Sequence, residues 1–253
     1  RRVGKTTILI QIIDFIKQED KNAHVIYINK EHNDFKFIKE AEDLFQYVKS
    51  KLSKNKTNYV FIDEIQEINE FEIALRQMLV EGIDLYCTGS NAKMLSGDLA
   101  THLSGRFIEF HISSLSFNEF LQIHKLENNN DALNKYIRYG GMPYLIHLPF
   151  DDEIVYGYLK SIYNTIILKD IVARYSIRDI DFLERLVEYL SDNLGSYVSS
   201  KRISDFLKAQ RVSLSVNTVM NYLKFLANSF FINKVQRLDI IGKKRFEWLK
   251  DLD

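Results

Sequence analysis

Two short groups of residues have the types and the spacing that phosphate chemistry requires. The first is Gly4-Lys5-Thr6, whose lysine can neutralise nucleotide phosphates and whose threonine hydroxyl can bind Mg²⁺. The second is Asp63-Glu64, which directly follows a run of four apolar residues. Its first carboxylate would hold Mg²⁺, usually through water, and its second would orient and deprotonate an attacking water. Together the two groups predict a site for magnesium-dependent hydrolysis of a nucleoside triphosphate.

The first group matches the second half of the phosphate-binding pattern G-x-x-x-x-G-K-[ST]. The first glycine of that pattern would fall two positions before Arg1, so we expect the loop and its strand to begin upstream and this fragment to bind nucleotide poorly. Apolar residues at helical spacing follow the group, which places it at a helix start, where backbone N–H groups and the helix dipole favour a phosphate. The expected nucleotide contacts in the loop are Arg1, Arg2, Val3, Gly4, Lys5, Thr6 and Thr7.

Strands that alternate with helices would position these groups. Apolar and β-branched runs predict buried strands, and amphipathic patterns between them predict helices, one of them over 35–53. The alternation predicts an α/β fold, with a parallel sheet that carries helices on both faces. The predicted strands are 23–29, 59–62, 83–88 and 107–112.

In open α/β sheets the ligand lies at the carboxyl ends of the strands, and polar residues gather at those ends here. They are Glu31, the Asp63-Glu64 pair and the group from Thr88 to Asn91. Taken alone, Asp63-Glu64 could equally be an acidic helix cap after a strand. The Gly4-Lys5-Thr6 group upstream favours the nucleotide site. Glu31 has two interpretations, as a residue that polarises water or as a helix cap.

Five segments resemble prokaryotic AAA+-type ATPases with an uncharacterised C-terminal region, known from archaea and Bacteroidetes-like bacteria. They are "RRVGKTT", "VFIDEIQ", "CTGSNAKMLSGDLATHLSGRFIEF", "LSFNEFL" and "YGGMP", and the resemblance covers nearly the whole chain. It implies that Lys5 and Thr6 are Walker A residues and that Asp63 and Glu64 are the Walker B pair. It also implies a sensor region at the end of the next strand, formed by Thr88, Ser90 or Asn91. Such ATPases often continue into a nuclease-like domain.

Arg106 lies where this family carries an arginine finger, which acts on the γ-phosphate bound by a neighbouring subunit. That interpretation implies a homo-oligomer. The alternative is an arginine at the end of a helix, which the preceding Gly105 also fits.

Residues 113–175 have a helical pattern, which Gly140-Gly141 and Pro143 break. In the family this part belongs to a helical lid, although a simple turn between two helices would have the same residues. The predicted domains are an ATPase core over 1–112, a lid over 113–178 and a further domain over 179–253.

The last domain has three amphipathic helical patterns and two strand-like runs around Gly242, which predicts a winged helix. In such a fold the third helix enters the major groove of DNA and the wing contacts the backbone. The alternative is a winged helix that only packs against the rest of the protein. The candidate DNA contacts are Asn217, Thr218 and Asn221 on the third helix and Lys243, Lys244 and Arg245 at the wing.

The charge distribution agrees with a polyanionic partner for the C-terminal part. The 253 residues have a net charge of zero, but residues 195–253 hold 11 Lys/Arg against 5 Asp/Glu. A solvated basic face would have the same composition. One cysteine excludes an intramolecular disulfide framework, and we recognise neither a membrane span nor a signal peptide. We therefore expect a cytoplasmic protein.

These features predict an ATPase that uses ATP and Mg²⁺ and couples its nucleotide state to a winged-helix module. The alternative is a winged-helix DNA-binding regulator whose nucleotide site is structural or inactive. The intact Lys5, Thr6, Asp63 and Glu64 favour the ATPase. A small-molecule kinase is a third and weaker option, since no acceptor site can be recognised.

Overall fold

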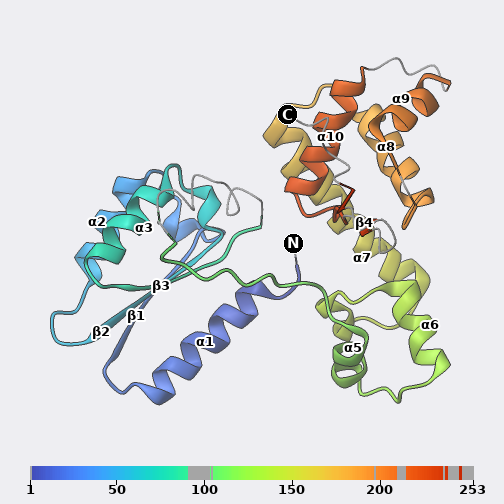
Figure 1. Ribbon diagram of the computed structural model, residues 1–253. Helices are drawn as coiled ribbons and strands as arrows, with labels where there is room; N and C mark the ends of the chain where they lie inside the picture. Colours follow the sequence, from blue (N-terminus) through green and yellow to red (C-terminus); the bar gives the residue numbers. More distant parts are fainter. Residues whose placement is uncertain are drawn as a thin grey trace. The chain divides into compact units, whose positions relative to one another are not determined.

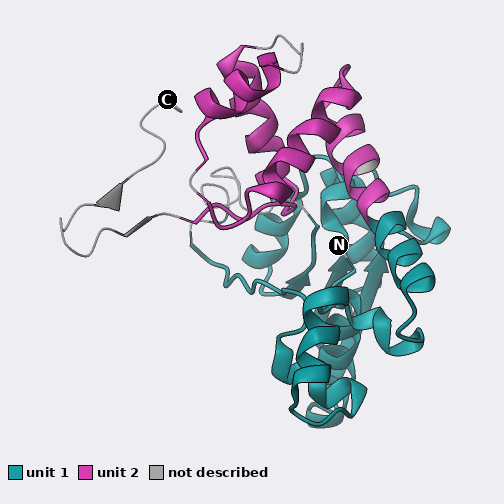
Figure 2. Cartoon of the chain, turned by 90° about the vertical axis from the view of Figure 1, so that its right-hand side faces the viewer, with its two compact units in different colours: residues 1–162 teal, residues 163–253 magenta. Residues whose placement is uncertain are grey.

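The computed structural model describes residues 2–90, 103, 105–196, 198–209, 215–235, 237–238 and 245–246. The chain divides into two compact units, residues 1–162 and 163–253 (Figure 2). The division falls inside helix α7 (Asp152–Thr165). The three predicted domains, with boundaries at 112/113 and 178/179, stay a prediction. None of the described helices has the length and apolar character that a membrane span requires.

A three-stranded parallel sheet forms the centre of the first half of unit 1. Its order is β1 (Ala23–Asn29), β2 (Thr57–Asp63) and β3 (Asp84–Cys87). The register pairs Asn29 with Asp63 and Ile62 with Cys87, so the carboxyl ends of the strands lie at one edge. The structure thereby confirms the predicted α/β class and the parallel pairing of the first three strands.

Helices cover both faces of this sheet (Figure 1). On one face, α1 (Lys5–Glu19) packs Leu9 and Ile13 against Phe61, whose ring stacks on Tyr86 at 4.6 Å between centroids. On the other face, α2 (Ala41–Lys51) and α3 (Phe71–Val80) pack against the alternate strand residues, which include Val60 and Ile62. Successive side chains of β2 therefore point to opposite faces of the sheet and contribute to a hydrophobic core on each face.

The predicted helix over 35–53 is shorter in the structure. A 3₁₀ turn, η1 (Asn33–Phe35), comes first, and α2 begins at Ala41. The reason is a capping box, in which the Asp43 carboxylate accepts the backbone N–H of Glu40 and fixes the helix start there. A second turn, η2 (Ile65–Glu67), separates β2 from α3.

The predicted fourth strand over 107–112 is wrong. Residues 106–112 form an irregular segment that leads to α5 (Phe117–His124), and the side chains of Ile108 and Phe110 are 82% and 79% exposed. A strand requires a neighbour for its backbone groups, and no described strand pairs with this segment. The helix expected between Asn91 and Gly105 lies almost entirely outside the described residues.

The second half of unit 1 is helical, as predicted. After α5 come α6 (Asn130–Tyr139), the 3₁₀ turn η4 (Pro143–His147) and α7. Gly140 ends α6 with φ 77°, so the break at "YGGMP" is confirmed. Gly141 leaves no room for a side chain, because a Cβ atom there would lie 2.2 Å from the carbonyl oxygen of Leu115.

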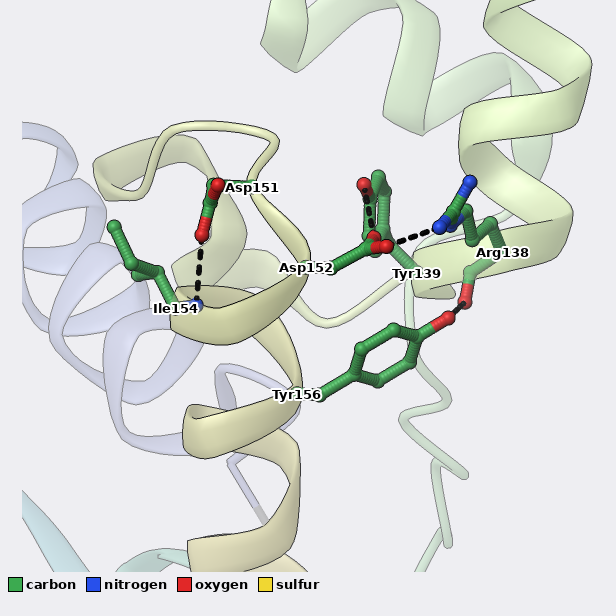
Figure 3. A network of polar contacts seen from close by, with 6 residues as sticks. All are labelled: Arg138, Tyr139, Asp151, Asp152, Ile154 and Tyr156. Atoms are coloured by element: carbon green, nitrogen blue, oxygen red, sulfur yellow. Dashed lines mark hydrogen bonds and ion pairs between the residues drawn. The ribbon is translucent and has the colours of Figure 1, made fainter.

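A polar network joins the end of α6 to the start of α7 (Figure 3). Asp152 accepts hydrogen bonds from the Arg138 guanidinium and, at 2.7 Å, from the Tyr139 hydroxyl. Asp151 caps the helix through the backbone N–H of Ile154 at 3.1 Å. The network links the two helices on either side of the turn.

Unit 2 contains the predicted three helices and two short strands. A π-helical segment, η5 (Ile166–Ala173), precedes α8 (Ile180–Asp192), α9 (Ser200–Ala209) and α10 (Val216–Asn228). Their buried faces form one core, which includes Phe182, Leu186, Ile203, Val219 and Leu226. The strands β4 (Arg237–Leu238) and β5 (Arg245–Phe246) pair antiparallel.

Candidate nucleotide site

The end of β2 meets the start of α1, although the two are far apart in the sequence. The hydroxyl of Thr6 donates a hydrogen bond of 2.7 Å to Oδ2 of Asp63, across 57 residues. The Thr88 hydroxyl, which follows β3, donates to Oδ1 of the same carboxylate. The structure thus brings together the predicted Mg²⁺ residues, Thr6 and Asp63, and adds Thr88.

The donor set around Asp63 fits a divalent cation. The residue is only 1% exposed, and no Lys, Arg or His within the described ranges forms an ion pair with it. Two hydroxyl groups donate hydrogen bonds to its oxygens, but a hydroxyl carries no positive charge. A buried carboxylate without a cationic partner is energetically costly, and a bound cation would remove that cost. The described residues contain no cluster of three or more His, Cys, Asp or Glu side chains that would hold a metal by themselves. Mg²⁺ at this place would therefore depend on phosphate and water oxygens besides Thr6 and Asp63.

The N-terminus of α1 is free of a side-chain cap. Gly4, with φ 91°, is the N-cap residue and supplies no capping side chain, and first-turn N–H groups of this kind are suited to bind an anion. Lys5 is half-buried at the first position of the helix, and Val3 is half-buried before it. Arg2 and Thr7 are exposed, and Arg1 lies outside the described residues. These placements agree with a phosphate site in front of the helix.

Glu64 is held in an uncommon conformation beside Asp63. Its φ of 57° is left-handed, and its backbone N–H donates to the Thr88 hydroxyl at 3.2 Å. The predicted residue Ser90 donates from Oγ to Glu64 Oε1 at 2.6 Å. The side-chain amide of Gln66 donates to Oε2. Asn91, also predicted, lies outside the described residues.

The polar residues at the end of β1 form hydrogen bonds within the turn that follows this strand. The Lys30 ammonium donates to the carbonyl oxygens of Phe35, at 2.6 Å, and Ile38, and burial lowers its pKa. Asn29 accepts the backbone N–H of Glu31 at 2.9 Å, and the Glu31 side chain is exposed. The structure therefore favours a turn at this strand end over a role for Glu31 in polarising water.

Sequence reasoning passed over Gln66, and it named Thr88 only as one of several sensor candidates. Both residues act through hydrogen bonds between loops that follow different strands, and a linear pattern does not reveal such contacts. The only signal for Gln66 was a polar side chain two positions after the carboxylate pair.

Arg106 follows Gly105, whose φ of 74° is typical of a chain that leaves a helical turn. Its backbone N–H donates to the carbonyl oxygen of Leu103 at 3.0 Å, and its side chain is exposed. It forms no hydrogen bond or ion pair with the described Asp63 or Glu64. An exposed arginine agrees both with a finger for a neighbouring copy and with a helix-end residue, so the finger stays a prediction.

The helical half of unit 1 reaches the phosphate loop. A Cβ atom added to Gly4 would lie 4.0 Å from Cγ of Pro143, which begins η4. The Tyr158 hydroxyl is buried without a hydrogen-bond partner among the described residues. Burial raises the pKa of Tyr158, and the charge of Arg2 partly opposes that shift. The break in "YGGMP" is therefore next to the loop and not merely a connection.

The candidate DNA contacts on α10 lie on its outer face. Asn217 and Asn221 are exposed, whereas Val219 is buried on the opposite side. Thr218 is half-buried, and its backbone N–H donates to the capping hydroxyl of Ser215 at 3.1 Å. Lys243 and Lys244 lie outside the described residues, and of Arg245 only its place in β5 is described.

Comparisons with known proteins agree with this geometry. Residues 1–121 match the family model described as an AAA domain, which supports an AAA-type P-loop ATPase-like domain there. Residues 130–246 match a family described as a domain of unknown function (DUF8612).

Three uncharacterized proteins are similar to nearly the whole chain. One from Haemophilus influenzae is 34% identical over 250 residues, which cover 96% of this chain and 62% of that protein. Two from Methanocaldococcus jannaschii are 33% and 24% identical, and they match 92% and 96% of this chain. The chain spans 54% and 57% of those two relatives, so it corresponds to somewhat more than half of such proteins.

Proposed function

We propose that the protein binds Mg·ATP and hydrolyses it at the site formed by Lys5, Thr6, Asp63 and Glu64. The observation that carries this proposal is the 2.7 Å hydrogen bond between Thr6 and Asp63. It joins the lysine–threonine group to the carboxylate pair at the carboxyl end of a parallel sheet, where ligands of α/β proteins bind. The AAA-domain match over residues 1–121 supports the same conclusion.

In this proposal each residue has its own role. The N–H groups at the start of α1 and the Lys5 ammonium would bind the phosphates. Thr6 and Asp63 would hold Mg²⁺, which neutralises charge on the β- and γ-phosphate oxygens when bound. Glu64 would orient the attacking water and accept its proton. Arg106 of a neighbouring copy would stabilise the charge that develops on the γ-phosphate.

Calorimetric titration of the full-length protein with ATP in the presence of Mg²⁺ tests the binding step. Lys5→Ala should weaken binding by tenfold or more, because it removes the cation that faces the phosphates. Lys17→Ala is the matched control, since Lys17 is an exposed lysine in the last turn of the same helix and should leave the affinity unchanged. An affinity of Lys5→Ala equal to that of the control would disprove the proposed phosphate site.

The outer face of α10 favours a second proposal, that unit 2 acts as a winged helix on duplex DNA. Asn217 and Asn221 are exposed one turn apart, Lys224 continues the same face, and the hydroxyl of a serine caps the start of the helix. The excess of basic residues in 195–253 would supply the phosphate contacts. In this proposal the ATPase part changes the state of the DNA-binding part.

Fluorescence anisotropy of labelled duplexes across a salt series separates the two kinds of contact. Replacing Lys243 and Lys244 by alanine should weaken binding to all duplexes and lower the salt slope by about one unit per lost phosphate contact. Asn217→Ala should instead reduce the preference between sequences, by about 1–3 kcal/mol at a contacted base. Lys54→Ala, in the ATPase part, serves as the control. If the protein binds no duplex even at low salt, the DNA-binding proposal is wrong and the three helices only pack against other parts of the protein.

A further inference from the structure

Both carboxylate oxygens of Glu64 already accept a hydrogen bond from the protein. Ser90 Oγ donates to Oε1 at 2.6 Å, and Gln66 Nε2 donates to Oε2. The side-chain oxygen of Gln66 accepts a hydrogen bond from the backbone N–H of Ser90 at 3.4 Å. The three residues therefore form a closed ring of hydrogen bonds between the turn after β2 and the loop after β3.

The backbone around this ring is fixed as well. The N–H groups of Glu64 and Ile65 donate to the hydroxyl and the carbonyl oxygen of Thr88, at 3.2 and 3.0 Å. A left-handed φ at a residue other than glycine costs on the order of 1 kcal/mol and persists where the surroundings enforce it. The direction of the Glu64 carboxylate is thus set by contacts to the loop that follows β3.

We propose that Gln66 is a positioning residue for Glu64, an inference that rests on the ATPase function proposed above. A carboxamide is suited to this place because it donates to Glu64 with one atom and accepts from Ser90 with the other. A carboxylate oxygen has two lone pairs, so accepting a hydrogen bond that fixes the plane of Glu64 is compatible with accepting a proton from water. Gln66 itself touches neither nucleotide nor water in this role.

Two substitutions separate the functions of the amide. Gln66→Met keeps the length of the side chain and removes both hydrogen bonds. Gln66→Glu keeps an acceptor for Ser90, but it loses the donor and sets a like charge beside Glu64. Gln46→Met is the matched control, because Gln46 also donates to a carboxylate, that of Glu42 at 2.6 Å, on an exposed part of α2.

Steady-state hydrolysis and ATP affinity of the full-length variants give the test. We expect kcat of Gln66→Met to fall tenfold to a hundredfold, the order of loss that small misplacements cause, with the Kd for ATP within twofold of wild type. Gln66→Glu should lose more activity than Gln66→Met, and Gln46→Met should lose none. In a Glu64→Gln background, Gln66→Met should cause no further loss, because its only role is to position Glu64.

The possible contradictions are distinct. Wild-type turnover by Gln66→Met, while Glu64→Gln is inactive, would overturn the positioning role and leave the ATPase proposal intact. An equal loss of ATP affinity and kcat would show that Gln66 only supports the local structure and would overturn the inference too. Wild-type turnover by Glu64→Gln would overturn the ATPase mechanism and, with it, the role of Gln66.

Discussion

A role for Asp63 could be predicted from the sequence alone. Its type and its place after four apolar residues predicted a magnesium residue, and the structure puts it 2.7 Å from the threonine expected to share that ion. The contact of Thr88 with the same carboxylate was not predictable at this level. It depends on the register between β2 and β3, and the sequence does not state that register.

The one cysteine of the chain allows a prediction at the same scale. Burial raises the pKa of the Cys87 thiol from 9.0 to about 12, so the fold favours the protonated form. Below pH 9 the thiol is protonated in both the folded and the unfolded chain, so its burial costs no proton. As the pH rises from 9 toward 12, the unfolded chain loses this proton more readily than the folded one, and the folded state becomes less stable. The free energy of unfolding of wild type should therefore fall between pH 8 and pH 10 by more than that of Cys87→Ala.

Urea unfolding of both proteins at the two pH values measures this difference. Cys87→Ala is a necessary comparison, because burial also raises the pKa of Tyr27 and Tyr86 in the same unit. Those tyrosines contribute to both proteins alike. A stability difference between the two proteins that does not change with pH would contradict the shifted thiol.

At the scale of elements, the spacing of apolar residues correctly predicted the helices and strands that pack against a core. The strand over 23–29 and the helix after Lys5 were recognised because their apolar residues face a core, and α1 buries Leu9 and Ile13. Residues 107–112 have the same strand-like composition but no described neighbour to pair with. The error at this segment arises because composition reports a preference, whereas a strand also needs a partner.

Two glycines of unit 1 should respond to alanine in opposite ways. At Gly141 a Cβ would meet the Leu115 carbonyl oxygen at 2.2 Å, and Leu115 also donates its N–H to Gly141 at 2.7 Å. Gly141→Ala should therefore destabilise the protein by about 1–3 kcal/mol or more, since backbone must move. Gly157 lies within α7 with open space around it, so Gly157→Ala should stabilise by about 0.5–1 kcal/mol.

Thermal unfolding of the two variants beside wild type checks the pair. The melting temperature should fall for Gly141→Ala and rise for Gly157→Ala. Shifts of the same sign in both variants would mean that the approach of Gly141 to Leu115 does not constrain the turn.

At the scale of the whole molecule, the sequence indicated an ATPase-like part followed by a helical part with a basic end. The structure has two compact units, with the parallel sheet in the first and the three-helix core in the second. The sequence did not predict where the units divide, because α7 and η5 continue across that position without a break in helical pattern. Coupling between the units is part of the proposed function and stays a prediction.

An arginine finger would make hydrolysis a property of the assembly. Subunits with Arg106→Ala should bind ATP but lack the finger, and subunits with Lys5→Ala should offer the finger but bind ATP poorly. Mixing the two should restore part of the activity, because an arginine finger increases kcat by orders of magnitude. Specific activity of wild type should also rise with protein concentration.

The matched control replaces Arg106→Ala in the mixture by Arg76→Ala, which alters an exposed arginine on α3 and should be active alone. Phosphate release is measured for each variant and for the mixture. If the mixture has no more activity than the sum of its parts, and rates are proportional to concentration, Arg106 is a helix-end residue.

The most direct test of the account is phosphate release from saturating Mg·ATP by full-length Glu64→Gln, with ATP affinity measured on the same sample. Glutamine can still hydrogen-bond water and Ser90 but is a far poorer base. We expect wild-type affinity with hydrolysis reduced by a factor on the order of 10²–10⁴. Hydrolysis at the wild-type rate would contradict it, because the carboxylate beside Asp63 would then have no part in the reaction.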